Sequence, residues 1–200
     1  MATTNNTAPL NLSPRYQIAI AVGLAALMIA TRGQHFPAVR EALPSASWAV
    51  FFLAGVYLRS LWVPVGFFVL ASFLDFAAIN WQGVSDYCVS PAYIALIPAY
   101  GALWFGGRWF AGHYTFKPVT LLWLVGAVLG SAFVCDVISS GAFYFFSGRF
   151  TETTLAGFVP RIIKYYPMFL SSMAFWVAIA AAMHAAIIVT RNYTVKSEHA

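Results

Sequence analysis

The chain has 200 residues, of which 61% are hydrophobic and only 8% are charged, whereas a soluble domain carries about 25% charged residues. This composition excludes a soluble enzyme and a disordered chain. The net charge of +5 comes from 11 Lys and Arg residues scattered among apolar runs, so it does not indicate a nucleic-acid partner. Aromatic residues make up 18% of the chain, which is typical of membrane proteins with aromatic belts. We therefore expect a protein embedded in a lipid bilayer.

Apolar runs in chain order predict six helices, at residues 16–31, 47–58, 61–79, 92–105, 118–146 and 162–190. The second and third helices come from one stretch, 48–79, which is too long for a single span at about 1.5 Å per residue and is interrupted by Arg59 and Ser60. Pro98 is a candidate kink in the fourth helix, and residues 139–141 are a candidate break in the fifth. Polar sequence predicts the larger loops, at residues 32–44, 80–91, 106–117 and 147–161.

The predicted fold is all-α, an integral membrane bundle of six transmembrane helices. We expect residues 1–14 to form a disordered tail, residues 15–191 the membrane domain and residues 192–200 a C-terminal tail. The first apolar run also resembles the core of a signal peptide, but only Arg15 precedes it and five apolar runs follow. Six spans place both termini on one side of the membrane. The basic, acid-poor loops of that side indicate the cytoplasm.

Small residues recur at four-residue spacing along the first helix, in the pairs Ala21–Ala25 and Ala26–Ala30. Such stripes allow two helices to approach closely in lipid. The stripe therefore serves either packing within the bundle or docking of a partner membrane protein.

No P-loop, dinucleotide-binding or zinc-protease motif is present, so the chain alone is not expected to hydrolyse ATP. Unusual residues gather on the predicted outer side instead. Cys88 lies in a polar loop before Pro91, where a thiolate would be a soft metal ligand and a nucleophile. A small buried apolar residue, or a disulfide with Cys135, is the alternative reading of this cysteine.

Two acids, Asp75 and Asp136, fall within predicted spans. A carboxylate there costs several kcal/mol unless it is paired, so each is either a functional group or half of an ion pair. His35 is the one histidine predicted on the outer side. It is either a solvated loop residue or a second axial metal ligand facing Cys88.

Aromatic and basic residues surround the cysteine loop in the predicted arrangement. Tyr87 and Tyr93 flank Cys88 and would supply apolar walls with polar tips. Arg161, at the start of the last helix, is either an interfacial anchor or a clamp for carboxamide or phosphate groups.

The size, the six spans and the short first helix with its alanine stripe resemble the substrate-binding S-components of ECF-type vitamin transporters. The segments 31–36 (TRGQHF) and 43–52 (LPSASWAVFF), with the lone loop cysteine Cys88, are similar to the BtuM family of small bacterial cobalamin transporters. The resemblance covers most of residues 15–191.

This resemblance implies an S-component-like bundle in the bacterial inner membrane that binds cobalamin (vitamin B12) on its outer side and takes part in its uptake. It implies that Cys88 ligates the cobalt, and cobalamin is then substrate rather than resident cofactor. A soft sulfur ligand would labilise a cyanide on the opposite face, so removal of cyanide is an expected side activity. The expected substrate contacts are Asp75, Tyr87, Tyr93, Arg161 and His35.

Several alternatives stay open at this point. His35 competes with Cys88 for the cobalt, and we favour Cys88 because it lies between aromatic residues in a less charged segment. The chain either docks on an ECF-type ATPase module through Ala21, Ala25, Ala26 and Ala30 or works without one. It could also carry another vitamin, or act as a membrane thiol redox protein through Cys88 and Cys135.

Overall fold

A computed structural model describes residues 12–32, 43–115 and 117–198. Within these ranges all regular structure is helical, which confirms the predicted all-α fold. The helices, in chain order, are α1 (Pro14–Arg32), α3 (Ser47–Tyr57), α4 (Trp62–Gln82), the 3₁₀ helices η1 (Asp86–Cys88) and η2 (Pro91–Ala95), α5 (Leu96–His113), α6 (Val119–Phe146) and α7 (Leu155–Glu198). The predicted tail 1–14 falls almost wholly outside the described residues.

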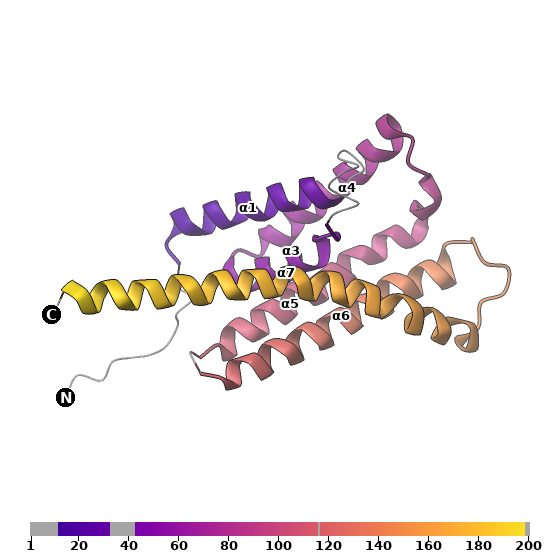
Figure 1. The fold of residues 1–200 in the computed structure, drawn as a ribbon. Helices are drawn as coiled ribbons and strands as arrows, with labels where there is room; N and C mark the ends of the chain where they lie inside the picture. The colour runs from indigo at the N-terminus through magenta and orange to yellow at the C-terminus, as the bar shows by residue number, and fades with distance from the viewer. Residues whose placement is uncertain (1–11, 33–42, 116, 199–200) are drawn as a thin grey trace.

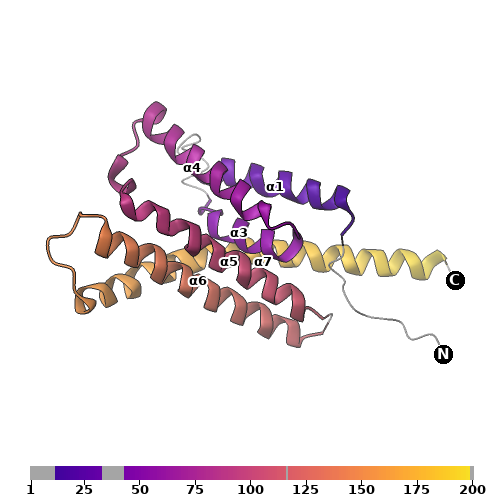
Figure 2. The same cartoon turned by 180° about the vertical axis from the view of Figure 1, so that it is seen from behind.

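The long helices run side by side in one elongated bundle (Figures 1 and 2). The start of α1, the α3–α4 turn, the α5–α6 linker and the end of α7 lie at one end, which we call the terminal end. The two 3₁₀ helices and the α6–α7 loop lie at the opposite end, the loop end. The short helix α3 contacts α1, α4, α5 and α7 and is buried throughout Ala49–Val56, so it forms the centre of the core.

Four helical segments are long and apolar enough to cross a membrane: Pro14–Arg32, Trp62–Trp81, Val119–Phe146 and Leu155–Thr190. Their outer faces remain apolar. On α4 the side chains of Val65, Val69, Phe73 and Phe76 are each at least 50% exposed and follow helical spacing. A continuous apolar surface of this kind is unfavourable in water, and it matches what lipid chains would cover.

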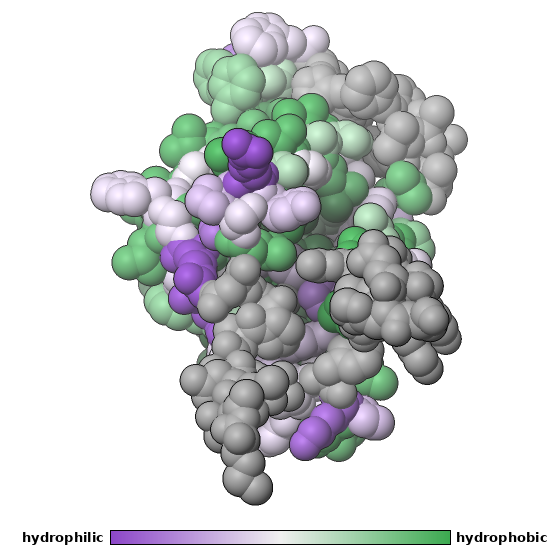
Figure 3. Space-filling view, turned by 90° about the vertical axis from the view of Figure 1, so that its left-hand side faces the viewer, coloured by the Kyte–Doolittle hydropathy of each residue, from purple (hydrophilic) through white to green (hydrophobic). Residues whose placement is uncertain are grey.

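The terminal end is polar by contrast. Figure 3 looks onto this end and shows hydrophilic residues among the hydrophobic surface of the helices. Exposed basic residues of the described chain lie at or near it: Arg15 begins α1, Arg59 lies in the α3–α4 turn, and Lys117 lies in the α5–α6 linker. This grouping matches the basic set that the sequence assigned to one side of the bundle.

Two glycines let α3 and α5 cross in close contact. A Cβ atom on Gly107 would collide with the backbone carbonyl of Phe52, and one on Gly55 would collide with the carbonyl of Trp104. Gly106 faces Ser131 of α6 in the same way. The predicted loop at 106–117 is therefore wrong over 106–113, because these glycines are positions of helix packing rather than helix breakers.

Other predicted boundaries need smaller corrections. Pro98 lies in the first turn of α5, where no intrahelical N–H is required, so it causes no kink of the kind expected. Helix α6 passes through 139–141 without a break.

The last helix begins at Leu155 rather than 162 and continues beyond 190 to Glu198. Its early start follows from a side-chain cap: the Thr154 hydroxyl accepts a hydrogen bond from the Gly157 N–H at 3.1 Å. Phe158 then stacks on Tyr144 of α6, with ring centroids 5.8 Å apart, and holds this first turn against the bundle.

The alanine stripe of α1 divides between two faces. Ala21 and Ala25 pack against the core beside the buried residues Leu24 and Met28, while Ala26 is exposed. The first pair thus serves packing within the bundle.

The glycine crossing makes a direct prediction about stability. We expect Gly107→Ala to lower the free energy of unfolding by about 1–3 kcal/mol, because its methyl group must push α3 and α5 apart. Thermal unfolding in detergent measures this as a lower midpoint. The matched control is Gly101→Ala in the same helix, where nothing lies within 4 Å of the added methyl, so helix propensity should raise the midpoint. Equal midpoints for the two variants would contradict the packing role of Gly107.

Candidate functional site

A buried arginine organises the loop end of the bundle. Arg32, the last residue of α1, donates from Nε and Nη2 to the two carboxylate oxygens of Asp75 on α4, at 2.9 Å each. Its Nη1 donates to the Ser47 hydroxyl at 2.9 Å and to the Tyr100 hydroxyl at 3.1 Å. The Arg32 side chain is 11% exposed and that of Asp75 30% exposed. This arrangement is a bidentate ion pair with almost every donor occupied, and it joins four helices.

A tyrosine completes the coordination of Asp75. The Tyr93 hydroxyl in η2 donates to Asp75 Oδ2 at 2.8 Å. Burial raises the pKa of Tyr93 to about 12, and its hydrogen bond to Asp75 acts in the same direction. The hydroxyl therefore stays protonated at neutral pH and keeps donating. Two residues singled out in the sequence, Asp75 and Tyr93, are thus in direct contact.

Asp75 and Tyr93 also line a cavity of about 280 Å³, which we call the cysteine-loop cavity. Its wall includes Asp86 and Val89, which lie on either side of Cys88 in the chain. The Ser90 hydroxyl, two residues beyond Cys88, is buried without a hydrogen-bond partner. Cys88 itself ends η1, and the structure describes its backbone only. The candidate thiol therefore belongs to a segment that borders this cavity.

A second cavity of about 250 Å³, the arginine cavity, lies on the other side of the same network. Tyr100 lines it, and so does Arg161 from the second turn of α7. The Arg161 guanidinium lies over the rings of Phe150 and Tyr165, at 4.5 and 5.8 Å from their centroids. It has no acidic partner among the described residues, so its hydrogen-bond donors are available to a polar ligand.

Tyr87 stands apart from both cavities. It lies in η1, is 46% exposed, and packs against Phe143 of α6 with ring centroids 5.6 Å apart. Arg149 of the α6–α7 loop covers its ring at 5.0 Å from the centroid. Tyr87 thus ties the cysteine loop to the α6–α7 loop. His35, the remaining predicted site residue, lies outside the described residues.

Cys135 and Asp136, the other cysteine and the other acid predicted within a span, are fully buried on α6. Cys135 and Asp136 both have 0% exposure, and Cys135 is a free thiol. The disulfide with Cys88 is therefore not formed. Across the described residues no group of three or more His, Cys, Asp or Glu side chains comes together as a metal site.

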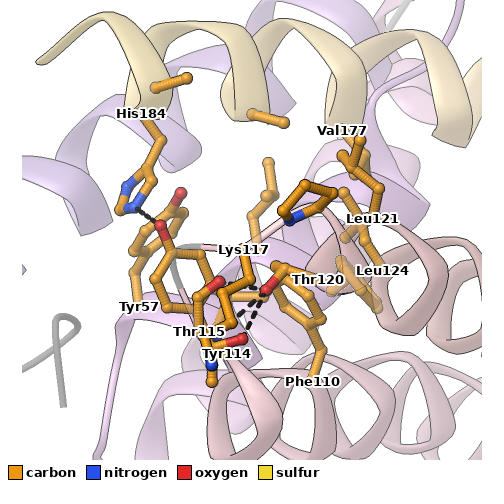
Figure 4. A pocket seen from close by; sticks show the side chains of 16 residues that line it. Tyr57, Phe110, Tyr114, Thr115, Lys117, Thr120, Leu121, Leu124, Val177 and His184 are labelled. Carbon is orange, nitrogen blue, oxygen red and sulfur yellow. Dashed lines mark hydrogen bonds between the residues drawn. The ribbon is translucent and has the colours of Figure 1, made fainter. Parts of the chain in front are cut away.

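A third pocket, of about 310 Å³, opens at the terminal end (Figure 4). It is bounded by α3, the end of α5, the α5–α6 linker, α6 and α7, and its walls are mostly apolar. Figure 4 shows His184 of α7 reaching Tyr114, with Nε2 3.0 Å from the hydroxyl. Of the predicted site residues whose side chains the structure describes, namely Asp75, Tyr87, Tyr93 and Arg161, none lines this pocket.

Comparison with known proteins adds no relative: no family model and no curated protein sequence matches this chain. The candidate site therefore rests on its own geometry and on the sequence pattern.

Sequence reasoning missed the centre of this site. Arg32 was placed in a loop, and Ser47 and Tyr100 were not considered, because their partners lie 15 to 68 residues away in the chain. The available signal was an acid inside an apolar span, since Asp75 needs a cationic partner.

The ion pair predicts a strong coupling between its two members. Removing one partner of a buried pair leaves the other uncompensated, so Arg32→Met should destabilise the protein by about 3 kcal/mol, the lower end of the usual range because Asp75 is partly exposed. The double variant Arg32→Met/Asp75→Asn should lose much less than the sum of the single variants. Thermal unfolding in detergent measures all three, and the exposed Arg15→Met is the control. Additive losses would show that the pair does not act as a unit.

Proposed function

We propose that this chain is a membrane-spanning, S-component-like protein that binds cobalamin at the loop end and takes part in its uptake, with Cys88 as an axial ligand of cobalt. The proposal places the loop end outside the cytoplasm of a bacterium and the terminal end inside. One observation carries it above the others: Asp75 and Tyr93 are hydrogen-bonded to each other and line a cavity bordered by the segment that holds Cys88. The resemblance to the BtuM family supplies the identity of the ligand.

The chemistry of the corrin ring fits these residues. Cobalt in a corrin has two axial positions, and a thiolate is a soft donor that suits one of them. The ring carries amide side chains, which need both donors and acceptors. Tyr93 and Asp75 offer these in the cysteine-loop cavity, and Arg161 offers donors in the arginine cavity. Tyr87 and His35 complete the proposed contacts.

Size sets a condition on this proposal. The two cavities are about 280 and 250 Å³, and drug-sized ligands already occupy about 300–1,000 Å³. A corrinoid is larger still, so it would need both cavities joined. Tyr93 of η2 lines one cavity and Leu96 of α5 lines the other, which makes the junction of η2 with α5 the segment that must move.

Ligand exchange is the proposed side activity. The Cys88 thiolate donates an electron pair to cobalt on one face, and a cyanide on the opposite face departs with its own electron pair. Cobalt keeps its oxidation state, so the exchange needs no reductant. Sulfur is a strong electron donor, and the weakened bond opposite it is the physical reason for the loss of cyanide.

The visible spectrum of bound cobalamin tests the assignment of Cys88. Purified protein should bind added cobalamin and show a sulfur–cobalt spectrum, which Cys88→Ala should abolish because the donor atom is gone. Cys135→Ala is the matched control and should keep the spectrum, since Cys135 is buried within α6. A sulfur–cobalt spectrum that survives Cys88→Ala would overturn this assignment. A spectrum lost in His35→Ala alone would give the cobalt to the histidine.

Experiments on the same purified protein distinguish two other functions from cobalamin transport. A transporter for another vitamin would leave cobalamin unbound in detergent and in liposomes. A thiol redox protein would need a Cys88–Cys135 pair, which the buried free thiol of Cys135 disfavours.

The source of energy is the second part of the proposal. An ECF-type ATPase module is one candidate partner, docking on α1; transport without a module is the other. Ala21 and Ala25 already pack inward, so Ala26 is the member of the stripe whose exposure leaves it open to a partner.

Uptake in cells distinguishes the two. If α1 docks on a module, Ala26→Trp should lower cobalamin uptake at least several-fold while binding by purified protein stays unchanged. Ile18→Trp, at an exposed position already occupied by a large side chain, is the control. Cobalamin uptake that persists in a host lacking every such module would show that docking is unnecessary.

A further inference from the structure

An acid without a counter-charge lies inside α6. The Asp136 side chain has 0% exposure, and its Oδ1 accepts a hydrogen bond from the Ser140 hydroxyl at 2.8 Å. Its Oδ2 is buried and has no hydrogen-bond partner in the part of the chain that the structure describes. Among the described residues, Arg32 and Asp75 form the one ion pair. No described cation therefore neutralises Asp136.

The groups around Asp136 do not supply the missing charge. Cys135 on the same helix and Tyr166 on α7 are the titratable groups that interact with it electrostatically. Tyr166 donates its hydroxyl to the Leu129 carbonyl at 3.0 Å. Both groups are neutral near pH 7.

The titratable groups on the other elements that pack against α6 contact partners other than Asp136. On α5, Tyr100 binds Arg32, Arg108 lies over the ring of Trp104, and His113 packs against Trp109 with the two rings tilted. In η2, Tyr93 donates to Asp75. Over residues 155–190 of α7 the remaining titratable groups are Arg161, Lys164, Tyr165 and His184. Arg161 and Lys164 lie against aromatic rings, and His184 lies against Tyr114.

Position makes a permanent charge at Asp136 unfavourable. The residue lies about 15 Å from the end of α6 and about 26 Å from its start, at a rise of about 1.5 Å per residue, which is within the apolar span. A carboxylate at this depth, with one oxygen unpaired, is far less favourable than the neutral acid. Asp136 is therefore suited to hold a proton rather than a charge.

A hydroxyl connects this acid to the candidate binding site. Ser140 lies one turn further along α6 and lines the arginine cavity together with Ser139, Tyr100 and Arg161. The Ser140 hydroxyl is thus both a wall of that cavity and the hydrogen-bond donor to Asp136. A proton entering from water in the cavity would have a one-step path to the carboxyl.

We propose that Asp136 is a proton-binding site through which movement of the substrate is coupled to movement of a proton. This rests on the proposed transport function and gives it a source of energy that needs no ATPase module. A hydronium ion in the arginine cavity transfers a proton to Ser140 Oγ as the Ser140 hydroxyl proton passes to Asp136 Oδ1. The hydronium ion loses one O–H bond and becomes water; one O–H bond forms and one breaks at Ser140 Oγ, and one forms at Asp136 Oδ1. The carboxyl returns the proton by the reverse steps when the cavity faces the other side.

Proteoliposomes loaded with the purified protein test the coupling. With the membrane potential clamped at zero by potassium and valinomycin, and the interior one pH unit more alkaline, radiolabelled cobalamin should accumulate about tenfold inside if one proton accompanies each molecule. Asp136→Asn resembles the neutral acid in shape, so it should fold and bind cobalamin but reach equal concentrations on both sides. Cys135→Ser, at the neighbouring buried position, is the control and should accumulate cobalamin like wild type.

An infrared measurement separates the proton site from the transport function. The carbonyl band of a protonated carboxylic acid should be present in wild type near neutral pH without any cobalamin, and absent in Asp136→Asn. Absence of that band in wild type would overturn the proton site. Accumulation by Asp136→Asn equal to wild type, or none by a wild type that still equilibrates cobalamin, would overturn the coupling. Failure of wild type to bind or move cobalamin while the band persists would instead overturn the proposed transport function.

Discussion

The constraint on which the loop end depends is the need to neutralise a guanidinium inside an apolar bundle. Arg32 cannot lose its charge at any physiological pH, so four helices supply acceptors around it. Asp75 from α4 neutralises the charge, while Ser47 and Tyr100 accept the two N–H groups of Nη1. Removing any one helix would leave a buried donor or acceptor unpaired. The relative positions of α1, α3, α4 and α5 are therefore fixed by hydrogen-bond geometry as well as by packing.

Packing fixes the rest of the core through close contact rather than through charge. The α3–α5 crossing is set by Gly55 and Gly107, where a methyl group would strike the opposite backbone. Dispersion forces decrease steeply with distance, so such close contact stabilises the crossing. The crossing positions Tyr100 on α5 against Phe51 on α3, with stacked rings 4.4 Å apart. Backbone contact in the core thus sets the position of a side chain that binds Arg32.

Each of the six predicted apolar runs forms a helix. The sequence predicts these helices well because the length of an apolar run depends only on neighbouring residues. It failed where a residue's role depends on a distant partner. Gly106 and Gly107 read locally as the start of a loop, and their function in packing is visible only once α3 and α6 are in place. Asp75 could be singled out because a charge inside a span is unusual in itself. Its partner could not, since Arg32 lies 43 residues earlier at a helix end that reads as polar loop.

Asp75 and Asp136 carry the same carboxyl group, but their surroundings in the bundle differ. Asp75 accepts three short hydrogen bonds, two of them from the guanidinium of Arg32, so it has a counter-charge in the folded state. Asp136 has one neutral donor, and its other oxygen has no partner among the described residues, which suits it to the proposed role of a proton-binding site. An ion-paired carboxylate orients the side chains that bind it, here Arg32 and Tyr93. The carboxyl of Asp136 lies one helical turn from Ser140, which lines the arginine cavity together with Tyr100, a hydrogen-bond partner of Arg32.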